Sequence, residues 1–447
     1  MTADPASQTL AHDAHAFVAR IDGPWCDPVA AMAAYADEAY AALLLSGRGG
    51  WSYLLRRPDA VGEDLPAMLG PRAAQGDDPP FRCGVLGLAS YELSARLETV
   101  APQARDPAWP DLTLARYPAL LAFHADDRRL VAIGRGGDQA QAEGRARDAM
   151  SWLEAPPSAP PSGGPLAAEV AVSLDDRDHA QAVAETVGRI AAGEIFQANL
   201  ARAWRGRLRS GRTPFDLFRR LAKASPASYA AYLRLPRRAV VSNSPERFLS
   251  VRGDVVETWP IKGTRPRGGD PAADEALARE LLASPKDRAE NLMIVDLMRN
   301  DLARVCAPGS VQVPELASLR TYANVHHLVS RVRGRLAPGR SAWDSFLAAF
   351  PPGSITGTPK LQAMQVIARH EPPRGPYCGS LFWAGFDGAL EASVLIRTVA
   401  FVEEAGGWRF EARAGGGVVA DSDPHAEAAE TRHKISAILA ALTGEGP

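Results

Sequence analysis

Helical periodicity is clearest in the second half of the chain. Apolar residues recur at helical spacing over residues 178–192, and Gly193 follows at a position typical of a helix end. A second periodic segment covers residues 424–442, with Asp423 as its predicted N-cap and a proline at its first position. The pattern therefore predicts two amphipathic helices, the second of which closes the chain.

A third helical region is predicted between residues 270 and 304. Ser284-Pro285 should interrupt it, because a proline disfavours helical geometry at the residue before it. Between residues 292 and 298 only Asp296 is polar, so this part of the helix is predicted to be buried on all sides.

Strand-like runs alternate with turn signals but not with helices. A hairpin is predicted around Gly253-Asp254. The predicted strands cover residues 51–55, 81–91, 119–133, 194–204, 240–251, 255–261, 383–401 and 408–419. Since strands and helices do not alternate as βαβ units, the chain is predicted to have an α+β fold.

A tract rich in Pro, Gly and Ser covers residues 154–168 and has no apolar periodicity. Such a composition is typical of a linker. We therefore predict an N-terminal α/β domain over residues 1–153 and a second domain over residues 169–447.

Composition narrows the class of protein. The 447 residues carry 50 Lys+Arg and 52 Asp+Glu, a net charge of −2, which disfavours nucleic acid or a membrane surface as a partner. Neither a signal peptide nor a membrane-spanning run is recognised. The four cysteines are far apart, without a CxxC pair, as expected for reduced thiols in the cytoplasm.

Lysine is rare in this chain. Five of the 50 basic residues are lysines, which leaves 45 arginines; the lysines are Lys223, Lys262, Lys286, Lys360 and Lys434. A lysine amine can lose its proton and act as a nucleophile, which arginine cannot do. Lys262 follows apolar residues at a predicted strand end, where desolvation would lower its pKa. The alternative from composition is a surface lysine in a basic loop.

Two pairs of carboxylates are spaced three residues apart on predicted helices. They are Asp287 with Glu290, and Glu427 with Glu430. Residues at this spacing share a helix face, and two such faces could form an oxygen-ligand site for Mg²⁺. The alternative is a solvated acidic face near a helix N-terminus.

Three further segments could bind an anion or move a proton. Residues 352–360 form a Gly/Ser/Thr loop before a predicted helix, and residues 415–417 are consecutive glycines. His327 could act as an acid or base, although a structural role is the more common one for an isolated histidine.

Together, these segments resemble the chorismate-utilising enzymes, which include anthranilate, aminodeoxychorismate, isochorismate and salicylate synthases. Nine motifs run in the family's order: GEIFQANL (193–200), SNSPERFL (242–249), PIKGTRPRG (260–268), ENLMIVDLMRNDL (290–302), HLVS (327–330), GSITGTPK (353–360), IRT (396–398), GGGVVADSDP (415–424) and ETRHK (430–434). The resemblance covers residues 175–440. It implies a two-layered sandwich of large, mostly antiparallel sheets with flanking helices, preceded by an N-terminal domain of the anthranilate synthase type.

The resemblance also implies a Mg²⁺-dependent reaction on chorismate and a role for each matching residue. Glu290 and Glu430 would be the main metal ligands, with Asp287 and Glu427 beside them, and His327 would help the C4 hydroxyl leave. The groups that would hold the substrate are Thr264, Thr356, Gly357, Tyr377, Arg397, Gly415, Gly416, Gly417 and Lys434.

Two positions indicate which reaction of the family to expect. Gln197 stands where enzymes that add water have a lysine base, so ammonia is the expected nucleophile. Lys262 resembles the aminodeoxychorismate synthase pattern, in which the amine attacks ring carbon C2 and ammonia then enters at C4. The expected product is 4-amino-4-deoxychorismate, a precursor of p-aminobenzoate and folate. The resemblance further implies a glutamine amidotransferase partner that supplies the ammonia.

Three alternatives stay open at this stage. Anthranilate synthase activity would make Lys262 incidental, an inactive protein of this fold would only bind a partner or metabolite, and a Schiff-base enzyme would use Lys262 on a carbonyl. Residues 43–47 match only loosely the segment that anthranilate synthases use for tryptophan feedback. Tryptophan inhibition is therefore not expected, while a buried structural tryptophan stays open.

Overall fold

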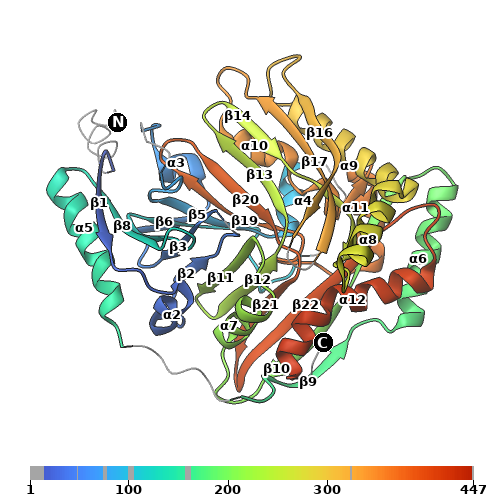
Figure 1. Ribbon diagram of the computed structural model, residues 1–447, viewed down its shortest axis with the longest axis horizontal. Helices are drawn as coiled ribbons and strands as arrows, with labels where there is room; N and C mark the ends of the chain where they lie inside the picture. Colours follow the sequence, from blue (N-terminus) through green and yellow to red (C-terminus); the bar gives the residue numbers. More distant parts are fainter. Residues whose placement is uncertain are drawn as a thin grey trace, which may run out of the picture.

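The structure is a computed structural model that describes residues 15–47, 49–73, 78–98, 105–156, 163–322 and 325–444. Two large sheets dominate it (Figure 1). Every strand pairing among the described residues is antiparallel. The α+β class and the large antiparallel sheets predicted from the sequence are thus confirmed.

The first sheet has twelve strands, with β9 paired to β10 beside the main path. In spatial order they are β1 (Phe17–Gly23), β8 (Arg129–Gly136), β7 (Ala119–His124), β3 (Trp51–Leu55), β2 (Ala42–Leu44), β11 (Tyr229–Leu235), β12 (Arg238–Ser244), β21 (Thr398–Glu404), β22 (Gly407–Val418), β10 (Gln197–Leu208) and β18 (Gly357–Thr358), with β9 (Ala167–Val172).

The second sheet has ten strands, with β16 paired to β17 beside the path. Their order is β15 (Ile261–Pro266), β17 (Val325–Arg335), β14 (Val255–Thr258), β13 (Arg247–Arg252), β20 (Leu390–Val394), β19 (Ser380–Gly385), β5 (Gly84–Ala89), β6 (Leu112–Tyr117) and β4 (Ala60–Gly62), with β16 (Gln312–Thr321). The predicted hairpin is present, since Val251 pairs with Val256 across the turn.

The N-terminal segment contributes strands to both sheets. β2 pairs with β11 in the first sheet, and β5 pairs with β19 in the second. The middle of the predicted linker, residues 157–162, lies outside the described residues. The tract therefore divides the chain in sequence, while each sheet is built from both sides of that division.

Successive side chains of a strand point to opposite faces of its sheet. Apolar side chains therefore form clusters both between the two sheets and on their outer faces. In β3, Tyr53 and Leu55 belong to the cluster between the two sheets, whereas Leu54 belongs to the cluster on the opposite face of the first sheet. Phe346 lies in a third cluster, between the second sheet and its covering helices. The chain thus buries both faces of each sheet.

Helices cover the outer faces, and α6, α8, α9, α11 and α12 gather on one side of the molecule (Figure 1). The helices are α2 (Pro28–Met32), α3 (Leu65–Leu69), α4 (Ser94–Leu97), α5 (Gln139–Ser151), α6 (Asp176–Ala191), α7 (Pro214–Ala224), α8 (Pro271–Ala283), α9 (Pro285–Ala303), α10 (Ala342–Ala349), α11 (Lys360–His370) and α12 (Pro424–Thr443). Single 3-10 turns are η1 (Ala33–Tyr35), η2 (Tyr91–Leu93), η3 (Trp152–Glu154) and η4 (Gly353–Ile355). No described helix combines the length and the apolar character needed to span a membrane.

Local signals set the helix boundaries. Asp423 caps α12 by accepting a hydrogen bond from the backbone of Ala426, and Ser284 both ends α8 and caps α9. The prediction that residues 292–298 are buried on all sides is wrong, because Leu292 is 55% exposed. α9 covers only one side of the second sheet, so it buries one face, which includes Ile294 and Met298.

Candidate active site

The candidate site lies where the edges of the two sheets meet. β10 and β18 end the first sheet, and β15 is the edge strand of the second. α9 packs against β15 and β17, while α12 packs against β22. This arrangement brings together strands and helices that are far apart in the sequence.

Lys262 enters the site from an irregular point of β15. The register of β15 against β17 shifts between Ile261 and Thr264, and Gly263 has a φ of +82°. A β-bulge of this kind redirects a side chain out of the regular alternation. A Cβ placed on Gly417 of β22 would lie 3.3 Å from Lys262 Nζ, so the amine approaches that glycine closely.

Gln197 reaches the same glycine from β10. A Cβ on Gly417 would clash with its Nε2 atom, and Asn199 of the same strand pairs with Gly417 in the sheet. The Gln197 side chain is fully buried, and neither its amide nitrogen nor its oxygen has a hydrogen-bond partner among the described residues. A buried amide without partners costs free energy, so it marks a place where a ligand can bond.

Burial lowers the pKa of Lys262 below its usual value. The negative charge of the nearby Glu290 carboxylate opposes this effect by raising the pKa. Lys434 adds a second positive charge that favours the neutral amine, while Glu246 and Glu430 oppose this. A lysine with a lowered pKa holds more of its amine in the nucleophilic form.

Glu246 is a candidate residue that sequence reasoning missed. It lies where the chain crosses from β12 to β13 and is 6% exposed, and Ser354 Oγ donates a 2.6 Å hydrogen bond to its carboxylate. Burial raises the pKa of Glu246, while Ser354 and the charge of Lys262 lower it. The signal that could have identified it is its place in the segment 242–249, one of the nine motifs of the family resemblance.

The four predicted metal ligands lie on α9 and α12. Burial raises the pKa of Glu290 and of Glu427, and the charge of Glu430 raises both further. In Glu430, burial raises the pKa, but the ion pair with Lys434 at 2.6 Å outweighs it and lowers the pKa overall. Asp287 lies against Gly263 and is paired with Arg265 at 3.3 Å.

These carboxylates suit Mg²⁺ by their chemistry. Glu427 Oε1 accepts from Ser422 at 2.7 Å, but its buried Oε2 has no partner among the described residues and faces Gly416. No group of three or more His, Cys, Asp or Glu close enough to hold a metal occurs within the described ranges. Mg²⁺ often takes one or two protein carboxylates and completes its shell with water and substrate, so the residues fit such a site.

His327 stands opposite Thr264 in the β15–β17 pairing. The Thr264 hydroxyl and His327 Nδ1 are 2.9 Å apart, and the Tyr322 ring packs edge-on at 5.6 Å. Burial and the positive charge of Arg397 lower the pKa of His327 to about 4. The imidazole is therefore neutral near pH 7. Arg397 itself has no ion pair with another described side chain, and burial lowers its pKa.

The predicted anion loop lies beside β10. The Thr356 carbonyl accepts a hydrogen bond from Asn199, and Gly357 approaches the Gln197 carbonyl too closely for any Cβ. The Thr356 hydroxyl donates to Pro352 within its own loop. Tyr377 is 6% exposed and belongs to the same hydrophobic cluster as Ile355 of this loop.

The glycines of β22 leave room for the surrounding groups. Gly416 faces Glu427, and Gly417 faces Gln197 and Lys262. Gly415 packs on β10, and its carbonyl accepts a 2.9 Å hydrogen bond from Lys434. Side chains at these positions would displace the groups that face the site.

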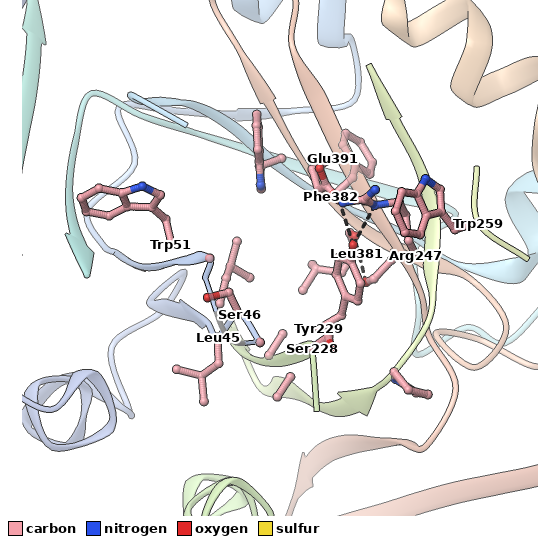
Figure 2. A pocket seen from close by; sticks show the side chains of 18 of the residues that line it. Leu45, Ser46, Trp51, Ser228, Tyr229, Arg247, Trp259, Leu381, Phe382 and Glu391 are labelled. Carbon is pink, nitrogen blue, oxygen red and sulfur yellow. Dashed lines mark hydrogen bonds and ion pairs between the residues drawn. The ribbon is translucent and has the colours of Figure 1, made fainter. Parts of the chain in front are cut away.

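A cavity of about 500 Å³ lies between the two sheets, next to the site (Figure 2). Leu45 and Ser46 line one side, and Trp259 and Ile261 line the side near Lys262. Figure 2 shows Tyr229, Arg247 and Glu391 joined inside it by hydrogen bonds. Residues 44–47 of the segment 43–47 thus form part of a cavity wall.

The site combines a desolvated amine, the buried carboxylates of Glu246 and Glu427, a guanidinium without an ion pair among the described residues, and a glycine-rich wall. Such a set can hold a small molecule with several carboxylates and carry out nucleophilic and acid–base chemistry on it. The fold and the site therefore define an enzyme for a small anionic substrate.

Residues 59–440 match the family described as chorismate binding enzyme, and the chain belongs to this family. The resemblance seen in the sequence is thereby confirmed, and the protein is a chorismate-utilising enzyme.

Relatives with two different names are about equally similar. The chain is 40% identical over 365 residues to aminodeoxychorismate synthase component 1 of Klebsiella aerogenes, covering 80% of this chain and 77% of that protein. It is 39% identical over 381 residues to anthranilate synthase component 1 of Streptomyces coelicolor, covering 81% and 73%.

Among solved structures, anthranilate synthase component I of Streptococcus pneumoniae matches with a TM-score of 0.73 at 24% identity, covering 98% of this chain and 93% of that chain. At this identity the similarity establishes the fold alone.

Proposed function

We propose that this protein aminates chorismate at C4 to give 4-amino-4-deoxychorismate. The observation that carries the proposal is the position of Lys262, a desolvated amine that approaches Gly417 beside the unpartnered amide of Gln197. A reaction in which water or ammonia is the only nucleophile would not require the amine of Lys262 at this place in the site.

In the first step, the neutral amine of Lys262 bonds to ring carbon C2. The ring double bonds shift and the C4–O bond breaks, so that the hydroxyl leaves as water after taking up one proton. The product of this step is an adduct in which the lysine nitrogen is attached to the ring.

In the second step, ammonia bonds to C4, the double bonds shift back, and the C2–N bond to Lys262 breaks. The proton that ammonia loses restores the acid used in the first step. The sum is chorismate plus ammonia giving 4-amino-4-deoxychorismate plus water, and Lys262 is regenerated.

Glu246 is our candidate for the acid that protonates the leaving hydroxyl. Its raised pKa favours the protonated form, and it lies within electrostatic reach of Lys262. His327 is neutral near pH 7, so it would donate a hydrogen bond to the leaving hydroxyl rather than transfer a proton to it. The unpartnered amide of Gln197 would hold the incoming ammonia.

The remaining groups would hold the substrate. Arg397 lacks an ion-pair partner among the described residues, and the glycine backbone of β22 and the Thr356–Gly357 loop offer room for carboxylates. We propose that Glu290, Glu427 and Glu430 hold Mg²⁺, with Asp287 beside them. When bound, the ion neutralises carboxylate charge on the substrate.

We also propose that a glutamine amidotransferase subunit supplies the ammonia in the cytoplasm and that the product serves p-aminobenzoate and folate synthesis. The relatives' names support a second subunit, since they are called component 1. The four cysteines are free thiols, as a reducing compartment would keep them.

Anthranilate formation is the second candidate. It is favoured by the anthranilate synthases that match at nearly the same identity, 39% and 37%. In that case ammonia would enter at C2 and Lys262 would have no covalent role.

The two candidates are separated by chromatography of the products. The protein is mixed with chorismate, Mg²⁺ and ammonium at mildly basic pH, and aminodeoxychorismate lyase is then added. p-Aminobenzoate formed only after addition of the lyase supports the proposal. Anthranilate would overturn it in favour of the second candidate, and no consumption of chorismate, even with the amidotransferase subunit added, would indicate an inactive binding protein.

The metal proposal has its own test. Glu290→Gln removes one anionic ligand and should abolish turnover together with Mg²⁺ binding measured by calorimetry. Wild-type activity that survives exhaustive treatment with a chelator would contradict it. Glu280→Gln, which removes an exposed carboxylate that pairs with Arg265, is the matched control.

A further inference from the structure

A buried arginine joins β10 and the loop that contains Thr356, two walls of the candidate site. Arg374 lies between α11 and β19, and its side chain is 1% exposed. Its Nη2 donates to the Asn199 carbonyl at 2.7 Å, and its Nη1 donates to the Ile355 carbonyl at 3.1 Å. Asn199 follows Gln197 on β10, and Ile355 immediately precedes Thr356.

The guanidinium is fixed in a single orientation. Glu371 accepts from its Nε at 2.9 Å and from its Nη2 at 2.7 Å, and Glu371 also accepts from the backbone of Ala201 on β10. A planar guanidinium paired through two donors cannot turn without breaking both bonds. The two carbonyls are therefore held at a fixed separation.

The backbone of Arg374 is fixed in turn by the N-terminal segment. Glu92 of η2 accepts hydrogen bonds from the backbone of Arg374 at 2.6 Å and of Gly375 at 3.0 Å. The backbone N–H of Tyr91 donates a 2.8 Å hydrogen bond to the Gly375 carbonyl, and the Tyr91 ring lies 4.8 Å from the guanidinium of Arg374. The ring of Tyr377, a predicted substrate contact, lies 5.8 Å from it on the same segment.

We propose that Arg374 is a positioning residue that sets the geometry of the chorismate-binding wall, and that Glu92 makes the N-terminal segment part of this wall. Arg374 touches no reacting atom. It aligns the strand of Gln197, the loop of Thr356 and the ring of Tyr377, so its loss should weaken substrate binding more than the chemical steps. This inference rests on the proposed function in that the Thr356 loop and Tyr377 are taken to bind chorismate.

The test compares Arg374→Lys with Arg56→Lys. A lysine keeps the charge near Glu371 but cannot donate to both carbonyls as well. Arg56 is also buried, at 4% exposed, and paired with a glutamate, Glu38, but it touches none of the predicted site residues. Chorismate dissociation constants from calorimetry without ammonia, KM, kcat and Tm are measured for each variant.

We expect Arg374→Lys to raise the dissociation constant and KM at least about tenfold while kcat stays within about threefold. Arg56→Lys should lower Tm without changing the dissociation constant. An unchanged dissociation constant in Arg374→Lys, or an equal rise in Arg56→Lys, would overturn the inference.

Glu92→Gln is the milder second variant if Arg374→Lys does not fold. The amide retains one acceptor for the two backbone donors, so we expect a rise in the dissociation constant of about threefold. No change in that variant would then overturn the inference. Wild-type protein that fails to bind chorismate would instead overturn the proposed function itself.

Discussion

The candidate site and the neighbouring cavity are formed by the same two sheets but differ in how their charged and amide groups are paired. In the site, both amide atoms of Gln197 and one oxygen of Glu427 lack partners within the described part of the chain. In the cavity, Arg247 and Arg252 both donate to Glu391, and Tyr229 completes the network.

This difference separates a candidate site with polar groups that a ligand could bond from a cavity whose charged groups are already paired with one another. Unpartnered buried polar atoms cost free energy that a ligand can recover, whereas a neutralised network offers a charged ligand little. Lys262 and Glu246 face the first region, while the residues just before them, Ile261 and Pro245, line the second. One layer of backbone thus separates the candidate site, the reactive side, from the cavity.

The largest expected effect comes from removing the amine on the reactive side. Lys262→Ala should lower amination on the order of 1,000-fold or more, because the covalent step is lost, while Mg²⁺-dependent chorismate binding stays near normal. Lys262→Arg should be equally inactive, since arginine keeps its proton. Product formation and calorimetric binding of the same samples check this. Full activity of the alanine variant would remove the covalent role but not the family.

The pH dependence of the amination rate tests the same role of the Lys262 amine. The reaction needs neutral Lys262, whose pKa burial lowers, together with protonated Glu246, whose pKa burial raises. The rate should therefore pass through a maximum as the pH rises, limited by protonated Lys262 at low pH and by ionised Glu246 at high pH. A rate that keeps rising beyond the usual lysine pKa would contradict the lowered value for Lys262.

The second prediction compares the buried carboxylate of Glu246 with the partly buried carboxylate of Glu391. Glu246→Gln should lower kcat about 100-fold, because the amide cannot supply a proton. Glu391→Gln should instead destabilise the fold by about 1–3 kcal/mol, since Arg247 and Arg252 lose their shared partner but remain partly exposed to solvent. Kinetics and denaturant unfolding are measured on both variants. The comparison fails if the two variants change kcat and the free energy of unfolding to the same extent.

A smaller effect is expected from the hydroxyl that contacts His327. Thr264→Val removes one hydrogen bond to Nδ1 while preserving side-chain shape, so kcat should fall about three- to tenfold. Thr258→Val, whose hydroxyl instead bonds a backbone carbonyl in the core of the second sheet, serves as a control for general destabilisation. A kcat in Thr264→Val equal to that of the wild type would show that the orientation of His327 does not depend on this bond.

The smallest expected effect concerns the cavity. Millimolar tryptophan should change the rate by less than about twofold, because Leu45 supplies no charge to the cavity and Glu391 is already neutralised by two arginines. Steady-state rates with and without tryptophan test this. Strong inhibition would mean that an ammonium group can compete for Glu391, and the contrast between the regions would be lost.

Much of the secondary structure is readable from the sequence because its causes are local. The cap at Asp423, the break at Ser284-Pro285 and the hairpin turn at Gly253-Asp254 each depend on a few consecutive residues. The family motifs are equally local, so the kind of enzyme could be predicted. The rarity of lysine by itself marks Lys262 and Lys434 as candidates for a chemical role.

Only the tertiary structure decides which of these residues meet. Lys262, Gln197 and Gly417 belong to three separate strands of two sheets. Because they are far apart in the sequence, no local pattern predicts that they meet. The exposure of Leu292 and the carbonyl contacts of Arg374 were unreadable for the same reason. Periodicity shows which side chains of a segment share one face, whereas burial and polar pairing depend on what the rest of the chain places against that face.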